Sequence, residues 1–198
     1  LHGSEHSFPT RRSSDLDEVR SHGGLTYGGL LLGKHGHTAE VGNMLLAIMS
    51  YYSQFAVEKL RVRPIPHIYH EFPSEEELYW FFRLGAKLTS RSASTAVNLQ
   101  KPLHFSSSRR NNRNKLLRFG CELQFEGSLR TFWTLLEATL KEQHGVIPTH
   151  SFEEIERLCG AFPKNIRLVT VSSAEGEMLC GTLLFLTQQV AHAQYIAA

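Results

Sequence analysis

The apolar side chains between residues 41 and 55 recur every three or four positions, which is the spacing of one face of an α-helix. They are Val41, Met44, Leu45, Ile48, Met49, Tyr52 and Phe55. The same spacing returns in two later segments, at Leu129, Phe132, Trp133, Leu136 and Leu140 and then at Ile155, Leu158 and Phe162. The pattern therefore predicts an amphipathic helix in each of the three segments.

Polar residues mark where helices are expected to begin. Ser74 with Glu77, and Ser151 with Glu154, have the spacing of a capping box, in which a hydroxyl and a carboxylate accept hydrogen bonds from N–H groups of the first helical turn. Ser128 stands where a single N-cap residue is expected. A fourth helix is therefore predicted after Ser74, and the two later helices of the apolar pattern have defined starts.

Segments rich in β-branched and apolar residues predict the strands. They lie at 19–32, within EKLRVRPIP, and at 90–99, 121–127, 166–172, 178–187 and 190–197. The last three follow one another without a helix between them, so we expect an antiparallel meander. The order before residue 100 is strand, helix, strand, helix, strand, and the order from residue 121 is strand, two helices, three strands. The fold class expected is α+β, with mixed α and β elements.

A run of basic residues precedes the predicted strand at 121–127. Within SSSRRNNRNKLLRFG, five cations fall in ten residues: Arg109, Arg110, Arg113, Lys115 and Arg118. The favoured interpretation is a solvated helix face, and the alternative is a patch for the phosphates of a donor substrate or of RNA. No aromatic residue lies among the cations themselves, which weakens the case for stacked single-stranded bases.

Composition limits the partners. The 198 residues are 41% hydrophobic and 20% charged, with a formal net charge of +2, so nothing in the total charge predicts nucleic acid or an anionic membrane. Three cysteines without a CxxC pair indicate neither a disulfide framework nor a thiolate zinc site, which fits a cytoplasmic protein. The longest apolar run, 178–186, is too short to span a bilayer, so we expect no membrane span.

The first sixteen residues stand apart from the rest. HSFPTRRSSDL, at 6–16, is similar to the conceptual translation of a widely used sequencing adapter. The alternative is a polar, disordered tail, which its serine, arginine and proline content permits. In either case we expect residues 1–16 to carry no function, and the adapter interpretation implies a fragment whose authentic part begins near Asp17.

Several segments resemble a known family. The two orders of elements resemble the GNAT acyltransferase superfamily, and SRRNNRNKLLRFGCELQ resembles the basic helix that joins tandem domains in Fem-like peptidoglycan-bridge aminoacyltransferases. A bacterial branch of that group is similar in SHGGLTYGGLLL, RPIPHIYHEFPSEEELYWFFRLGAKL, FWTLLEATLKEQH and VAHAQYIAA. The resemblance implies two incomplete GNAT-like domains, each a central mixed sheet flanked by helices. Residues 17–104 would be the C-terminal half of the first, and residues 105–198 the N-terminal half of the second.

The resemblance also implies a donor site. In the superfamily, the pyrophosphate of the donor lies on backbone N–H groups where the fourth strand turns into a helix, because that helix end carries unpaired donors and a positive dipole. The corresponding turn here contains Gly33, Gly36, His37 and Thr38, with Thr38 as the expected helix cap. These four residues match the signature of the superfamily only in a degenerate form.

The implied reaction is the attack of an amine on the acyl carbon of a coenzyme A thioester or an aminoacyl-tRNA ester. The implied acceptor is an amine, such as that of a cell-wall precursor, and no cofactor is held tightly. Four residues on the strands similar to fourth strands are expected to line the sites: Tyr27, His22, His192 and Tyr195. The basic helix at 106–118 is the expected contact for tRNA. The alternative is a noncatalytic binding or scaffold module with the same fold, since a fragment of this kind is expected to be inactive.

Two other patterns do not predict a site. His67, His70 and Glu71 could bind a metal, but they lack the HExxH order, and flanking prolines oppose a regular helix, so no metal is expected. Gly28 to Lys34 nearly matches a phosphate-binding loop. That loop needs Ser or Thr after the lysine to bind magnesium, and His35 stands there instead.

Overall fold

The computed structural model describes residues 17–21, 26–33 and 36–198. The chain divides into two compact units, Leu1–Arg91 and Ser92–Ala198. The sequence had placed the division between residues 104 and 105. The segment 92–104 therefore belongs to the second unit, although it contains no helix or strand.

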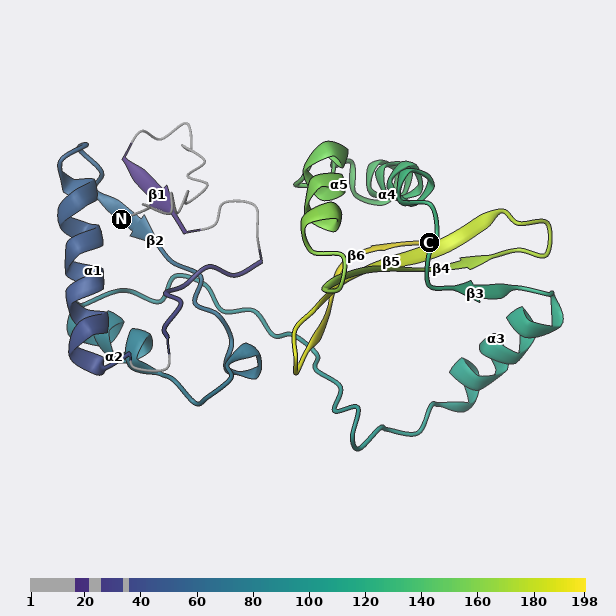
Figure 1. Ribbon diagram of the computed structural model, residues 1–198, viewed down its shortest axis with the longest axis horizontal. Helices are drawn as coiled ribbons and strands as arrows, with labels where there is room; N and C mark the ends of the chain where they lie inside the picture. The colour runs from purple at the N-terminus through teal and green to yellow at the C-terminus, as the bar shows by residue number, and fades with distance from the viewer. Residues whose placement is uncertain (1–16, 22–25, 34–35) are drawn as a thin grey trace. The chain divides into compact units, whose positions relative to one another are not determined.

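The first unit contains one small sheet and two packed helices (Figure 1). Its elements are β1 (Glu18–Arg20), α1 (Thr38–Ser53), β2 (Lys59–Arg61), the short 3-10 helix η1 (His67–Tyr69) and α2 (Glu76–Arg83). Strands β1 and β2 pair in parallel. Helix α1 packs on α2 at Gly42, which lies against the indole of Trp80, and the Trp80 Nε1–H donates to the carbonyl of Thr38 at 2.5 Å.

Three predictions for the chain before residue 100 are wrong. The segment 90–99 is not a strand: every residue in it is exposed, because small polar side chains offer no apolar face to bury against a neighbouring strand. The predicted strand at 19–32 is reduced, in its described part, to β1 and an isolated bridge between Gly28 and Arg63. The N-cap of α1 is His37 rather than Thr38, which is already helical.

The capping box predicted at Ser74 and Glu77 is also absent. Helix α2 has Glu75 as its N-cap, and the Ser74 hydroxyl donates to the carboxylate of Glu76 at 2.6 Å. Glu77 instead accepts a hydrogen bond from the backbone N–H of Leu30 at 2.9 Å. A contact with a residue distant in the sequence therefore replaces the local cap.

The second unit is a four-stranded antiparallel sheet with two helices on one face (Figure 1). Its elements are α3 (Ser107–Arg118), β3 (Glu122–Gln124), α4 (Leu129–His144), α5 (Phe152–Ala161), β4 (Ile166–Ser172), β5 (Met178–Leu186) and β6 (Ala191–Ala197). The strand order is β3-β4-β5-β6, so the predicted meander is confirmed. Helix α4 contacts β5 and β6, and α5 contacts β4.

Both predicted helix starts of the second unit are confirmed. The Ser128 hydroxyl accepts from the N–H of Thr131, and Ser151 and Glu154 form a full capping box. The helices and the sheet enclose a core of Phe132, Trp133, Leu136, Phe152, Ile155, Leu168, Leu183 and Ala197. Gly181 of β5 lies directly under Phe132, where a Cβ atom would come within 2.7 Å of the ring. The core therefore uses this glycine to admit the aromatic ring.

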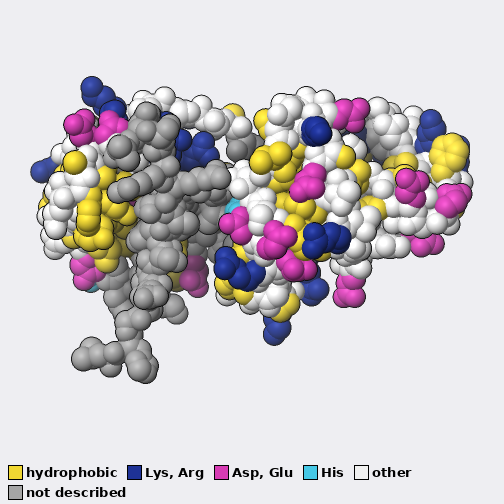
Figure 2. All heavy atoms as spheres, turned by 90° about the horizontal axis from the view of Figure 1, so that it is seen from above, with side chains coloured by type: hydrophobic (Ala, Val, Ile, Leu, Met, Phe, Trp, Pro, Cys, Tyr) yellow, Lys and Arg dark blue, Asp and Glu magenta, His cyan; other side chains and the backbone are white. Residues whose placement is uncertain are grey.

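The described residues thus form five α-helices, a two-stranded parallel sheet and a four-stranded antiparallel sheet, which is a mixed α+β fold. Many large apolar side chains lie on the surface as well as in the core (Figure 2). Met44 and Met49 of α1, and Phe55 just beyond its end, are about half exposed, although the sequence pattern placed all three on one apolar helix face. None of the described helices has both the length and the apolar character needed to cross a membrane.

Candidate functional site

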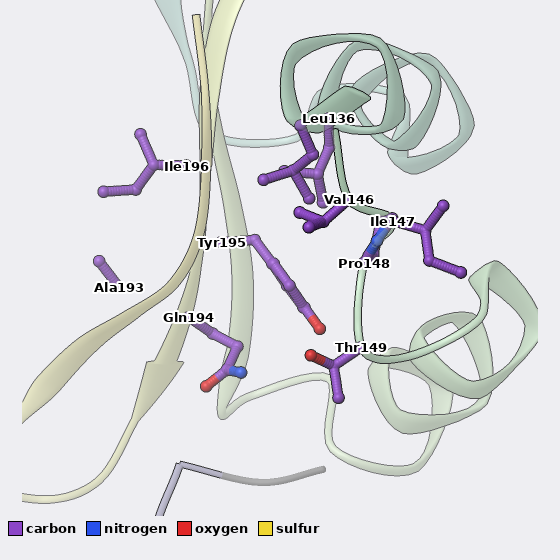
Figure 3. Close-up of a pocket in the computed structure, with 10 residues that line it drawn as sticks. Leu136, Val146, Ile147, Pro148, Thr149, Ala193, Gln194, Tyr195 and Ile196 are labelled. Carbon is purple, nitrogen blue, oxygen red and sulfur yellow. The ribbon is translucent and has the colours of Figure 1, made fainter. Parts of the chain in front are cut away.

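An open pocket of about 400 Å³ lies in the second unit between α4, the connection from α4 to α5, and β6. Its apolar wall comes from the helix and the connection, at Leu136, Leu140, Val146, Ile147 and Pro148. Its polar groups are Thr149, Gln194 and Tyr195. The Tyr195 side chain points across the pocket toward the connection, whereas Ile196 points to the opposite side of β6 (Figure 3).

An irregularity in β6 directs Tyr195 into this pocket. In the pairing of β6 with β5, Leu184 is opposite Ala193 and Leu183 is opposite Tyr195, so Gln194 is an extra residue. Side chains of a regular strand alternate between its faces, and one extra residue reverses the alternation beyond it. The bulge therefore places Tyr195 on the same face as His192, the face that α4 and α5 cover.

Tyr195 forms a hydrogen bond with His150, the residue just before α5. The Tyr195 hydroxyl lies 2.5 Å from Nδ1 of His150. The next residue, Ser151, is held by the capping box: its N–H donates to the Glu154 carboxylate at 2.8 Å, and its hydroxyl accepts from the Glu154 N–H at 3.2 Å. The helix start therefore fixes the backbone on which His150 stands.

Aromatic packing holds the Tyr195 ring from the other side. The ring meets Trp133 of α4 edge to face, with 5.3 Å between centroids, and Trp133 in turn meets Phe152 at 6.4 Å. Edge-to-face pairs of this kind add stability beyond the area they bury. The Nε1–H of Trp133 is buried without a hydrogen-bond partner among the described residues. Trp133 thus holds the ring of Tyr195 by edge-to-face contact, and the hydrogen bond with His150 holds its hydroxyl.

Burial shifts the pKa values of both partners in the direction that favours the uncharged side chain. It lowers the pKa of His150, an effect that the nearby Glu154 carboxylate partly opposes. It also raises the pKa of Tyr195. The Tyr195 hydroxyl donates to Nδ1 of His150 in the tautomer with the ring hydrogen on Nε2, and accepts from Nδ1 in the other tautomer. Burial thus favours the uncharged form of both groups, which a hydrogen bond joins at the wall of the pocket.

The other predicted lining residues lie in different surroundings. His192 is on the pocket face of β6, opposite Phe185. Tyr27 lies in the first unit, where its ring contacts Tyr69 with 5.5 Å between centroids, and burial is the main cause of the raised pKa of Tyr69. His22 lies outside the described residues. Among the described candidates, Tyr195 is the one that lines the pocket.

The predicted donor turn lies at the N-terminus of α1. Gly36 donates to the carbonyl of Gly33 at 3.1 Å, and the N–H of His37 donates to the carboxylate of Glu40 at 3.1 Å. Thr38 is the first helical residue. A carboxylate at a helix N-terminus satisfies a free N–H group and the positive end of the dipole. Glu40 therefore disfavours a phosphate on the N–H of His37, and the role of this turn stays a prediction.

No metal centre is evident in the described part of the chain. His70 uses Nε2 in a contact of 3.0 Å with the carbonyl of Ile65. No three histidine, cysteine, aspartate or glutamate side chains of the described residues gather as metal ligands. His67, His70 and Glu71 accordingly do not form a cluster suited to a metal ion.

Sequence analysis did not find His150, the partner of Tyr195. Nothing in the spacing of THSFEE pairs this histidine with a strand 45 residues away. The one available signal was its place directly before a predicted capping box, where the backbone direction is fixed.

Comparisons with known proteins leave the family open. No family model matches the chain, and no curated protein matches it.

Proposed function

We propose that this protein is an N-acyltransferase that moves an acyl or aminoacyl group to an amine. The donor would be a coenzyme A thioester or an aminoacyl-tRNA ester. The observation that carries the proposal is the hydrogen-bonded pair of Tyr195 and His150 at the wall of an open pocket. Its support from the fold is the order strand, two helices, three strands from β3 to β6, which is the order expected for the first half of a GNAT-like domain.

The chemistry needs one proton to move from nitrogen to the leaving group. As the amine attacks the acyl carbon, an N–C bond forms, and the C–S bond of a thioester or the C–O bond of an ester breaks. The amine proton passes to the Tyr195 oxygen while the tyrosine proton passes to Nδ1 of His150. The leaving sulfur or oxygen then takes a proton back through the same pair, so His150 ends neutral.

The pocket suits the approach of an amine to this pair. A primary amine must arrive without its third proton, and an apolar wall disfavours the ammonium form. Leu136, Leu140 and Val146 supply that wall, and Tyr195 is the polar group facing it. Positioning of the two reactants beside the proton acceptor is the main requirement for such a reaction, and no metal is needed.

The first unit has a separate proposed role as a noncatalytic binding or scaffold module. Glu40 favours this second role, because its carboxylate already accepts from the N–H of His37 at the turn where a donor pyrophosphate would lie. In this view, acyl transfer belongs to the second unit alone.

Donor binding tests the proposal. Thermal unfolding of the full chain should shift upward with acetyl-coenzyme A or with charged tRNA, since a ligand that binds only the folded state stabilises it. Thr149→Trp, which places a large ring in the pocket mouth, should remove the shift. Thr131→Trp, at an exposed position of α4, is the control that should keep it. The absence of any shift with either donor would contradict acyl transfer and leave the binding module.

A further inference from the structure

We propose that the segment 101–119 of the second unit is a binding site for single-stranded nucleic acid. The segment comprises the end of an irregular stretch, helix α3 and the residue after it. It carries a row of cations, and an exposed aromatic ring flanks each end of α3. The inference does not depend on acyl transfer, because it concerns a different surface and needs no donor.

The charge of this region differs from that of the rest of the unit. Between residues 92 and 121 there is no aspartate or glutamate, and there are six cations: Lys101, Arg109, Arg110, Arg113, Lys115 and Arg118. Residues 122–198 contain nine acidic and five basic side chains. A local excess of positive charge in a nearly neutral chain indicates a local anionic partner.

These cations are available to a ligand. Every residue from 92 to 120 is exposed, so no part of the unit covers the segment. No lysine or arginine of α3 takes part in a salt bridge with a described residue. Within the described part of the chain, the Arg110 guanidinium donates to the Ser107 hydroxyl at 3.5 Å and that of Arg113 to the side-chain oxygen of Asn114 at 3.2 Å. The guanidinium groups therefore keep most of their donors for phosphate oxygens.

Helix α3 arranges three of the arginines on one side. Residues three and four apart are neighbours on a helix surface, so Arg113 lies one turn beyond both Arg109 and Arg110. One turn advances about 5 Å along the axis, which lets neighbouring guanidinium groups reach successive phosphates of one strand. Ser106 caps the helix by accepting from the N–H of Arg109, so the row has a fixed start.

An exposed phenylalanine lies beyond each end of the helix. Phe105 is 63% exposed and Phe119 is 66% exposed. What sets these two rings apart is their place beside a row of cations, because unpaired bases stack on exposed aromatic rings whatever their sequence. The Lys115 ammonium lies 5.9 Å from the centre of the Phe119 ring, so a cation for a phosphate stands beside a platform for a base. Rings at the ends and cations between them suit a flexible single strand better than a duplex.

Two other partners fit these observations less well. A membrane-bound helix needs an apolar stripe, and α3 has only two apolar residues, the adjacent Leu116 and Leu117. The acidic side chains of residues 122–198 in a second copy could attract the cations, but carboxylates would not bind the exposed phenylalanine rings. Both partners are outcomes of the experiment below.

Fluorescence anisotropy with a labelled oligouridine, the deoxy strand of the same length and a hairpin duplex tests the proposal. Both single strands should bind more tightly than the duplex, and tighter binding of the RNA would add a contact to its 2′-hydroxyls. Affinity should fall with salt, and changing Arg109, Arg110 and Arg113 together to Gln should reduce the slope of log K against log salt by about two. Phe105→Leu should weaken binding about fivefold or more while keeping an apolar side chain.

A matched variant controls for total charge. Lys141→Gln, Arg157→Gln and Lys164→Gln together remove three exposed cations from elsewhere in the unit and should leave affinity and slope unchanged. An equal loss in both triple variants would overturn the site. Failure to bind any oligonucleotide would also overturn it. In that case, binding to anionic lipid vesicles would identify a membrane as the partner. Dimers that dissociate with salt in light scattering would identify a second copy of the chain. Because the oligonucleotides carry no acyl group, these outcomes are independent of the proposed acyl transfer.

Discussion

The hydroxyl of Tyr195 lies 2.5 Å from Nδ1 of His150, although 45 residues separate them along the chain. One partner stands on an edge strand and the other at the start of a helix. The contact forms because a bulge at Gln194 turns Tyr195 inward and because the capping box of α5 fixes the backbone beside His150. The fold of the second unit thus brings together the two residues on which its proposed chemistry depends.

The lowered pKa of His150 predicts a loss of stability in acid. Its folded-state pKa lies below the ordinary value of 6.5, so the unfolded chain binds the proton more readily. Stability contributed by the neutral ring is present above pH 6.5 and is lost as pH falls through the folded pKa. Urea unfolding across this range should show a smaller acid loss in His150→Gln than in the wild type. His144→Gln, an exposed histidine change, is the control, and equal acid losses in the wild type and His150→Gln would contradict the burial argument.

Glu77 predicts the opposite slope in the first unit. Burial raises its pKa above the ordinary 4.5, while the hydrogen bond from the N–H of Leu30 opposes this shift. The folded state therefore holds the proton more tightly, and stability falls as pH rises from 4.5 through the folded pKa. Glu77→Gln should flatten that fall, because an amide keeps an acceptor without a charge. Glu75→Gln, on the exposed N-cap, should retain it; a wild-type slope in Glu77→Gln would refute the prediction.

Gly181 predicts a packing defect in the core. A Cβ atom there would lie 2.7 Å from the Phe132 ring, which is fully buried and cannot move away without disturbing its neighbours. Gly181→Ala should cost about 1–3 kcal/mol in the free energy of unfolding, the usual penalty of overpacking. Gly160→Ala makes the same chemical change in α5, where nothing lies within 4 Å, and should be neutral or slightly stabilising. Similar losses at both positions in chemical denaturation would argue against this packing.

Local patterns predicted the second unit better than the first. The starts of α4 and α5 follow from Ser128, Ser151 and Glu154, because a cap is a contact between residues three apart. The meander follows from three successive apolar strands joined by short turns. In the first unit, Glu77 has the spacing of a cap residue, but its carboxylate accepts from the N–H of Leu30. This partner lies far away in the sequence, so the local spacing does not predict it.

The candidate site was predictable only in part. Tyr195 was expected from the resemblance of its strand. Its direction depends on the register between β5 and β6, which the alternation in VAHAQYIAA does not reveal, since the extra residue is visible only when the partner strand is in place. The pairing with His150 depends in turn on how α5 packs against the sheet. Such long-range geometry has no signature in a local pattern.

The rate of amide formation in Tyr195→Phe tests the proposed chemistry most directly. This change keeps the ring against Trp133 and removes only the hydroxyl that faces His150. With acetyl-coenzyme A or aminoacyl-tRNA and a panel of primary amines, mass spectrometry should detect an amide product from the full-length wild type and from full-length Tyr51→Phe, a hydroxyl deletion at an exposed position of α1. Tyr195→Phe should be slower by a factor of about 10²–10⁴, the usual contribution of a positioned proton-transfer group. A Tyr195→Phe rate equal to that of the wild type, or no amide from the wild type with either donor, would contradict the assignment.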